Sequence, residues 1–398
     1  MDEAPSPASL RDLLVFFLRL GFTAFGGPAA HIAMMEEEVV HRRRWLSRDR
    51  FLDLLAAANM LPGPTSTELA IYIGYVQAGW LGLLVGGGCF ILPAAGMTLG
   101  VAWAYVHFGK LPEAAWLLYG VKPVVIAVVL QAIWRLGREA VKTRFLAVLG
   151  GAGVVLSLLG LHHLALLFGS GAVAGLARWL AARRTPGEAP GTPLLGGLPV
   201  APAVPGAKAA AVAATVAAPA AAVSLWPLAL AFLKVGALLF GSGYVLLAFL
   251  RADLVQHHHW LTEAQLIDAV AIGQVTPGPV FTTATFIGYV LAGTRGALVA
   301  TVAIFLPSFV LVAVSGPLVR RLRQSPVGGA FLDGVTVAAL ALMAVVTWQL
   351  ARVALVDVTT AALALVSAVL LLRFRINSAW LVLGGASLGL LVHVLHLV

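Results

Sequence analysis

The sequence predicts an all-α polytopic membrane protein built from two inverted-topology repeats. Three observations predict it. Of the 398 residues, 60% are hydrophobic and only 11% are charged, whereas soluble domains carry about 25% charged residues. Many apolar stretches reach the roughly 20 residues that a bilayer core demands. Motifs also recur at a fixed spacing, and each repeat is expected to hold about five spanning helices plus one helical hairpin interrupted at Pro-Gly-Pro.

The duplication emerges when 215 is added to the residue number. Three motifs of the first copy then fall on three of the second: Phe25-Gly26 on Phe240-Gly241, Trp45-Leu46 on Trp260-Leu261, and Pro62-Gly63-Pro64 on Pro277-Gly278-Pro279. Beyond these prolines the spacing is 214, and ten of the twenty positions from Gly74 to Pro93 are identical in the second copy. Shared apolar composition would not keep Gly, Pro and Trp in register.

The order of elements follows from this duplication. We predict an N-terminal repeat at 1–182, a flexible Pro/Ala/Gly-rich linker at 183–225 and a C-terminal repeat at 226–398. Spans are predicted in the first repeat over 9–34, 80–107, 112–136, 144–160 and 162–182. Those of the second are predicted over 226–250, 295–319, 328–352, 357–373 and 378–397. The interrupted elements, 48–79 and 262–292, hold two helices each, too short to cross a bilayer.

Positive charge predicts the topology. If each interrupted element enters and leaves on one side, 18 of the 26 Lys and Arg residues share a side, which marks that side as cytoplasmic. This arrangement puts the N-terminus outside, the linker in the cytoplasm and the second copy upside down. Inverted repeats are typical of secondary transporters with alternating access.

The Pro-Gly-Pro breaks are the first candidate site. Proline stops one helix, and the next helix begins with free N–H groups and a partial positive charge that favour an oxyanion. The candidate binding residues at the breaks are Gly63, Thr65, Ser66, Thr67, Gly278, Thr282 and Thr283. The alternative is a re-entrant turn that only shapes the helix bundle.

Ionisable and small residues inside apolar segments are the second set of candidates. Arg19 and Lys234 occupy matched positions in mid-helix, where a charge usually faces a partner or a pathway. They could bind the substrate or only pair with Asp53, Asp268 or Glu68. The glycine-rich segments after them add Gly26, Gly27, Gly241 and Ser242, either as a second unwound anion-facing segment or as helix-packing positions. Glu68, Asp53 and Asp268 are the proton-coupling candidates, and Glu68 has threonines at its place in copy two.

Several classes of function lack their sequence signals. The single cysteine, Cys89, cannot form an internal disulfide or a redox pair. The ten histidines show no metal-ligand spacing, and there is no phosphate-binding or dinucleotide motif. We therefore expect no cofactor, no catalytic residues and no nucleic-acid partner.

Together these motifs resemble the chromate ion transporter family in its long-chain, two-domain form. The resemblance rests on FGGP at 25–28, the acidic stretch at 36–38, the Pro-Gly-Pro at 62–64 with its Thr/Ser cluster, and the second Pro-Gly-Pro at 277–279. It implies export of chromate from the cytoplasm, coupled to the proton gradient, with sulfate as a competing anion. The second copy departs from FGGP, with Gly241-Ser242-Gly243 in place of Gly26-Gly27-Pro28.

The expectation is a secondary active transporter of a tetrahedral oxyanion in the inner, cytoplasmic membrane. Its partners would be chromate or sulfate and the lipid bilayer, and the oligomeric state stays open, with a homodimer as one option. An anion channel fits the same inverted repeats. A membrane-embedded enzyme is a further alternative, which the absence of a clustered acid/base pair disfavours.

Overall fold

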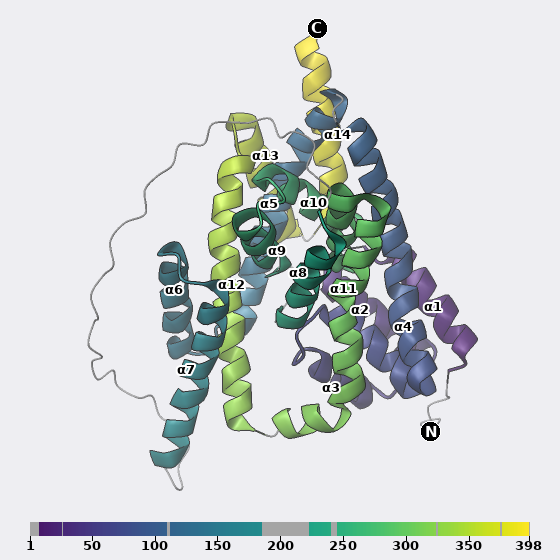
Figure 1. The fold of residues 1–398 in the computed structure, drawn as a ribbon, viewed down its shortest axis with the longest axis vertical. Helices are drawn as coiled ribbons and strands as arrows, with labels where there is room; N and C mark the ends of the chain where they lie inside the picture. The colour runs from purple at the N-terminus through teal and green to yellow at the C-terminus, as the bar shows by residue number, and fades with distance from the viewer. Residues whose placement is uncertain are drawn as a thin grey trace.

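The computed structural model describes residues 8–25, 27–109, 112–184, 223–239, 245–323, 325–374 and 376–397. Over these ranges the chain is helical and contains no strand, which confirms the all-α prediction. Six of the described helices are long and apolar enough to cross a membrane. Their outer surfaces carry large exposed apolar side chains such as Trp80, Leu92 and Val302, as lipid-facing helices do. The ribbon forms one elongated helical bundle (Figure 1).

The helices of the first repeat follow the predicted order. They are α1 (Leu10–Thr23), α2 (Gly27–Glu36) continued by the π-helical turn η1 (Glu37–Arg42), α3 (Arg48–Ala58), α4 (Thr65–Phe108), α5 (Pro112–Ala140), α6 (Arg144–Leu158) and α7 (His163–Arg184).

The second repeat reproduces this series. It comprises α8 (Leu225–Leu238), α9 (Leu246–Leu250) continued by η3 (Arg251–His257), α10 (Glu263–Val275), the short turn η4 (Val280–Thr282), α11 (Thr283–Arg323), α12 (Pro326–Ala354), α13 (Val358–Phe374) and α14 (Ser378–Leu397). The bounds of α8 are those of α1 plus 215, and the bounds of α12 are those of α5 plus 214. The duplication seen in the sequence is therefore a duplication of structure.

The predicted spans over 9–34 and 226–250 are wrong. The first breaks after Thr23, and α2 returns antiparallel to α1, so that Asp12 at the start of α1 lies 3.9 Å from Arg43 beyond η1. The described helices α1 and α8 each end shortly before a glycine-rich stretch of sequence, where hydropathy alone shows one long apolar segment, and glycine is a poor helix former. Each repeat thus holds two re-entrant hairpins and four longer helices.

The second hairpin contains the Pro-Gly-Pro break, as predicted. α3 runs to the break, and the first arm of α4 (65–77) returns from it. The chain then reverses at Ala78 and Gly79, where Gly79 has a φ of +58°. A Cβ on Gly74 would lie 2.0 Å from the Gly82 carbonyl oxygen, so only glycines allow the two arms to pack this closely. α11 reverses in the same way at Ala292 and Gly293.

The two repeats are inverted relative to each other. Lys142, just beyond the end of α5, contacts Asp333 near the start of α12 at 2.8 Å. Tyr119, near the start of α5, donates a hydrogen bond to Asp357 beyond the end of α12 at 2.5 Å. α5 and α12 are the same helix in the two copies, and these contacts show that they run antiparallel. The predicted inversion is confirmed.

The repeats are also intertwined. α6 and α7 of the first repeat pack along α12 of the second, and α13 and α14 pack along α5. The main hydrophobic core accordingly draws on both copies, with Val124 and Val128 from α5 and Val335 and Leu342 from α12. Neither repeat can bury its apolar faces alone.

The linker call at 183–225 falls mostly outside the described residues. The helix ends that flank it are described, however, and they lie at opposite ends of the bundle. α7 ends beside the start of α12, where Gly175 approaches Val327. α8 instead lies with its partner η3 in the half that contains the α6–α7 connection, around His162 and His163. The described ends that flank the linker, Arg184 of α7 and Leu225 of α8, therefore lie toward opposite ends of the bundle.

Candidate functional site

The two Pro-Gly-Pro breaks exchange hydrogen bonds with the other repeat. Gly63 N–H donates to the Leu239 carbonyl oxygen at 2.8 Å, and Gly278 N–H donates to the Ala24 carbonyl oxygen at 2.9 Å. Ala24 and Leu239 are equivalent residues that end α1 and α8. The interruptions of all four hairpins therefore meet between the two inverted repeats.

Both central glycines are required by this crossing. Gly63 has a φ of +145° and Gly278 one of +93°, a region that disfavours other residues. A Cβ on Gly278 would lie 2.6 Å from the Ala94 Cβ, and one on Gly63 would lie 2.4 Å from Glu68 Oε1. Gly278 thus lets its backbone approach the first repeat, and Gly63 leaves room for the side chains of Glu68 and Ser308.

Helices begin at the crossing, as the anion-cradle hypothesis requires. α4 begins at Thr65 directly after Pro64, which offers no side-chain cap to the first N–H groups. α2 begins at Gly27, which has a φ of +76°. Helix starts of this kind favour negative charge. The other members of the predicted glycine-rich set, Gly26, Gly241 and Ser242, lie outside the described residues.

The hydroxyl groups at the two breaks are used differently. In the second repeat Thr282 donates to the Pro279 carbonyl at 2.9 Å and Thr283 to the Val280 carbonyl at 2.7 Å. In the first repeat the Thr67 hydroxyl is buried and has no hydrogen-bond partner within the described chain. Ser66 instead lies 3.2 Å from the Nδ1 atom of His31. The first break therefore keeps more unused hydrogen-bonding capacity.

His31 is a member of this site that the sequence did not reveal. It is fully buried, and its Nε2 atom lies 3.1 Å from the Ala24 carbonyl, the group that also accepts from Gly278. Leu246 stands at the equivalent position of the second copy. A polar residue inside an apolar helix and in one copy only was the available signal, the same signal that identified Glu68.

Glu68 lies at the centre of the crossing. Its carboxyl is fully buried, and neither oxygen has a hydrogen-bond partner in the part of the chain that the structure describes. Glu68 Oε1 and the Ser308 hydroxyl both border the space beside Gly63. A buried carboxyl without a partner is costly when ionised, so it is suited to carry a proton.

The two predicted cations lie in two separate cavities. Arg19 lines a cavity of about 530 Å³ between α1 and α2–η1, together with Glu38, Arg42 and Arg43. Lys234 lines one of about 400 Å³ between α8, η3 and the α6–α7 connection. The cavities are equivalents, since Lys234 stands at Arg19 plus 215. The structure does not bring the two cations into one shared site.

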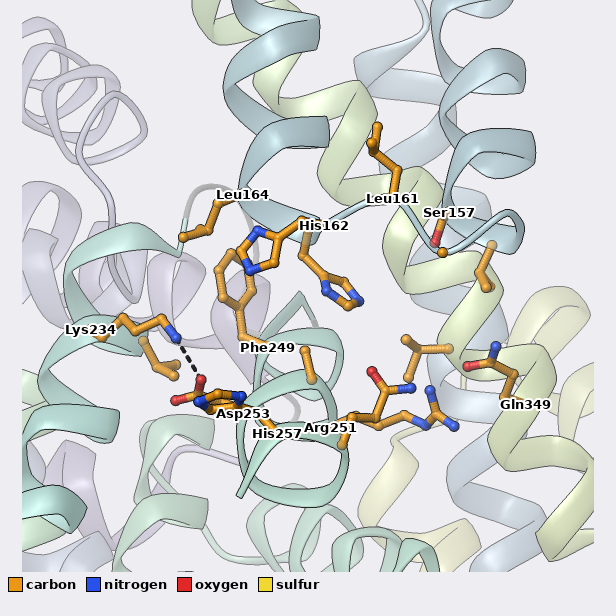
Figure 2. Close-up of a pocket in the computed structure, with 17 residues that line it drawn as sticks. Ser157, Leu161, His162, Leu164, Lys234, Phe249, Arg251, Asp253, His257 and Gln349 are labelled. Atoms are coloured by element: carbon orange, nitrogen blue, oxygen red, sulfur yellow. Dashed lines mark hydrogen bonds and ion pairs between the residues drawn. The ribbon is translucent and has the colours of Figure 1, made fainter. Parts of the chain in front are cut away.

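The cavities differ in how the cation is held. Figure 2 shows Lys234 facing Asp253, with Nζ and Oδ1 2.5 Å apart. Asp253 is 8% exposed, while the Lys234 side chain is 44% exposed. Arg19 has no carboxylate within 4.0 Å among the described side chains. Its backbone carbonyl accepts a hydrogen bond from Thr23.

The matched acids Asp53 and Asp268 have unlike surroundings. Asp268 is buried and lies 3.1 Å from Lys122 Nζ, and it accepts a hydrogen bond from Tyr105 at 2.9 Å. Asp53 is exposed, and it interacts with another residue of the chain. The Asp268–Lys122–Tyr105 group links α10, α5 and α4. Its partners favour a structural role over proton transfer.

The arrangement supplies binding groups rather than reactive ones. No group of three His, Cys, Asp or Glu residues within the described ranges could hold a metal ion. Helix starts, hydroxyls and cavity cations can receive an anion, and Glu68 and His31 can exchange protons.

Comparison with known proteins gives the same picture. The family model described as chromate transporter matches residues 11–176 and 226–390. A chromate transport protein of Cupriavidus metallidurans is 35% identical over 97% of this chain and 94% of its own length. A probable chromate transport protein of Synechococcus elongatus is 33% identical over 90% and 89%, and a chromate transport protein of Pseudomonas aeruginosa is 32% identical over 88% and 83%.

No solved structure shows a significant match to this chain. The family match covers both repeats, including both Pro-Gly-Pro crossings and both cavities. Helices long enough to span a membrane, an inverted duplication and relatives that align over nearly their whole length all agree. The chain belongs to the chromate transporter family.

Proposed function

We propose that this chain is a secondary active transporter that exports chromate, or a similar tetrahedral oxyanion such as sulfate, across the cytoplasmic membrane. The observation that carries the proposal is the reciprocal crossing in which Gly63 and Gly278 each bond to the opposite repeat. Inverted repeats with broken helices that meet near the middle of the membrane are typical of alternating access. The names of the relatives support chromate as the substrate.

The anion would bind beside the crossing, where Thr65, Ser66 and Thr67 begin the returning arm of α4. Helix starts and hydroxyls there would replace part of its hydration. Gly27 and Gly63 would permit close approach of the backbone. Thr282 and Thr283 of the second repeat are bonded to their own backbone, so we assign them the smaller share.

Glu68 is our candidate for proton coupling. It is the buried carboxyl without a described partner, and it borders the same Gly63 as the proposed anion site. A proton bound to Glu68 would change the charge next to the anion. An ionised Glu68 would repel the anion and a protonated one would not, so binding of the proton and binding of the anion would be linked.

We propose a different side for the N-terminus from the one that the sequence suggested. Ala8 N–H donates to Gln77, whose amide donates to the Trp45 carbonyl, so the start of α1 lies with the basic loop at 41–50. If that loop is cytoplasmic by the positive-inside rule, the N-terminus lies there too. The cavity of Arg19 would open toward the cytoplasm and that of Lys234 to the outside.

The test is transport by everted membrane vesicles from cells that express the chain. We expect chromate to accumulate in the vesicle lumen beyond its equilibrium level when a pH gradient is imposed, and competition by sulfate. Vesicles with Gly63→Val, which blocks the crossing, are the control. Flux that never exceeds the electrochemical gradient would instead identify an anion channel.

A further inference from the structure

The first hairpin of each repeat, formed by α1 with α2–η1 and by α8 with α9–η3, ends in the same local structure. Arg44 and His259 are equivalent, and they share a positive φ of 53° and 52°. Arg43 N–H donates to the Glu38 carbonyl at 2.9 Å, and His258 N–H donates to the Asp253 carbonyl at 2.9 Å. The backbone therefore presents equivalent side chains in equivalent places.

The side chains that follow Glu38 and Asp253 in the sequence also occupy equivalent positions. The Arg43 guanidinium lies over Trp45, 5.0 Å from the ring centroid. The His258 ring stacks on Trp260, the equivalent tryptophan, with centroids 4.2 Å apart. His258 thus stands where the first repeat has an arginine, and His257 stands at the position of a second arginine, Arg42.

The equivalent acids Glu38 and Asp253 pair with different cations in the two repeats. Glu38 is bonded to Arg43 at 2.7 Å and to Arg42 at 3.1 Å. Asp253 is instead bonded to Lys234, from the neighbouring helix α8. The counterpart of Lys234 is Arg19, which lines the same cavity as Glu38 but is not paired with it.

This difference follows from the chemistry of the residue types. Arginine is charged at all physiological pH values, so Arg42 and Arg43 always compete for Glu38. Histidine is charged only near or below about pH 6.5. While His257 and His258 are neutral, Lys234 is the cation left to Asp253.

We infer that Lys234 is a conditional oxyanion-binding residue, released from Asp253 when His257 and His258 become protonated. In that state the second repeat takes the charge arrangement of the first, with the acid held by residues that follow it and the α8 cation free to bind a small divalent anion. This inference rests on the proposed function, because it concerns one mouth of the same pathway.

Other charged groups face this cavity and must be separated from the effect. Arg251 is held by Glu263 at 2.5 Å, so it does not compete for Asp253. His162 and His163, at the α6–α7 connection, also line the cavity. Their protonation would add positive charge without changing the partner of Asp253. Substitution of each histidine pair distinguishes the two causes.

The experiment measures binding of radiolabelled sulfate to the purified full chain in detergent, at about pH 5.5 and about pH 7.5. An Arg19→Gln background removes, from the other cavity, the cation that is not paired with Glu38. We expect binding about fivefold tighter at the acid pH, as release of one partly exposed ion pair predicts. Lys234→Gln should abolish this difference, and His162→Gln with His163→Gln should leave most of it.

Two further variants should keep Lys234 released from Asp253 at any pH. His257→Arg with His258→Arg copies the first repeat, and Asp253→Asn removes the competing acid. Both should bind sulfate tightly at either pH, and a single symmetric peak in size exclusion confirms that each is folded. A pH difference that survives Lys234→Gln, or one that both of these variants retain, overturns the inference.

Failure of the proposed function has a different signature. If the unsubstituted chain neither binds sulfate or chromate at either pH nor transports them in vesicles, both proposals fail. If it transports them while the Asp253→Asn and arginine variants keep the ordinary pH difference, only the release of Lys234 is refuted.

Discussion

Glu68 and His31 are buried polar side chains present in one repeat only, and they adjoin the same helix start through Gly63 and Ser66. Burial of such groups costs several kcal/mol unless a partner or a function compensates. Both copies could instead have carried the residue types found in the second copy, a leucine as at position 246 and a threonine as at position 282. This asymmetry is why we place the proposed proton coupling in the first repeat.

Replacement of Glu68 by glutamine tests that role. Glu68→Gln keeps the size and polarity of the side chain but cannot carry a proton. We expect chromate uptake by everted vesicles to lose its response to an imposed pH gradient, while anion binding stays within about twofold of the unsubstituted protein. Glu139→Gln, an exposed change at the end of α5, is the matched control. An undiminished response to the gradient would remove Glu68 from the coupling mechanism.

Asp268 is predicted to act in stability, in contrast to Glu68. Lys122→Met leaves the buried Asp268 carboxylate without its cation and should lower the free energy of unfolding by about 3 kcal/mol. The double variant with Asp268→Asn removes both charges and should recover most of the loss, since Tyr105 can still donate. Thermal unfolding in detergent of the unsubstituted chain, the two single variants and the double variant measures this coupling. If the losses in stability of the single variants add up to that of the double variant, the two residues are not coupled.

The sequence predicted some of these residues and missed others for definable reasons. Position within an apolar helix identified Arg19, Lys234 and Glu68. It could not show that Arg19 and Lys234 line separate cavities, because that depends on how the hairpins fold back. Lys122 had no matched partner in the sequence, and its contact with Asp268 spans 146 positions of the chain.

At the scale of elements, the breaks determine the fold as much as the helices do. Boundaries of the long helices were predicted closely, since hydropathy and loop charge both mark them. The hairpin of α1 and α2 was missed because its interruption is a short glycine-rich segment inside continuous apolar sequence. Hydropathy cannot distinguish a helix that crosses from one that turns back halfway.

The Pro-Gly-Pro crossing gives a stability prediction for an element. Gly278→Ala forces a Cβ against Ala94 and into a positive φ, and should lower the free energy of unfolding by about 2 kcal/mol. Gly96→Ala, in the long arm of α4, is the control, because an added Cβ there meets nothing within 4 Å. Equal melting temperatures for the two variants would show that the crossing tolerates a side chain.

For the whole molecule, inversion and intertwining were only partly predictable. Charge distribution and repeat spacing gave the inversion, which the antiparallel α5 and α12 confirm. Nothing in the sequence showed that α7 would pack on α12 of the other copy, or that α14 would pack on α5. Such exchange depends on which apolar faces match in three dimensions, and a single sequence does not encode this as a local pattern.

The number of crossings leads to a prediction about the connection between repeats. Four segments of the first repeat are expected to cross the membrane, namely the long arm of α4 and the helices α5, α6 and α7. The hairpins add no crossing, so the number of crossings is even. α7 therefore ends on the side where α1 begins, yet the inverted α8 must begin on the other side. We therefore predict that Arg184 and Leu225, the described residues at the two ends of the connection, lie on opposite sides of the membrane, whereas the sequence suggested a cytoplasmic linker.

Cysteine labelling in intact cells tests this connection. In a Cys89→Ser background, Ser224→Cys should react with a membrane-impermeant maleimide, because we expect the start of α8 to lie outside. Arg183→Cys, at the end of α7, should react only after the cells are permeabilised, as should Ser47→Cys in the basic loop before α3. If both Arg183→Cys and Ser224→Cys require permeabilisation, the first repeat crosses the membrane an odd number of times, and the proposed assignment of the Arg19 cavity to the cytoplasmic side fails.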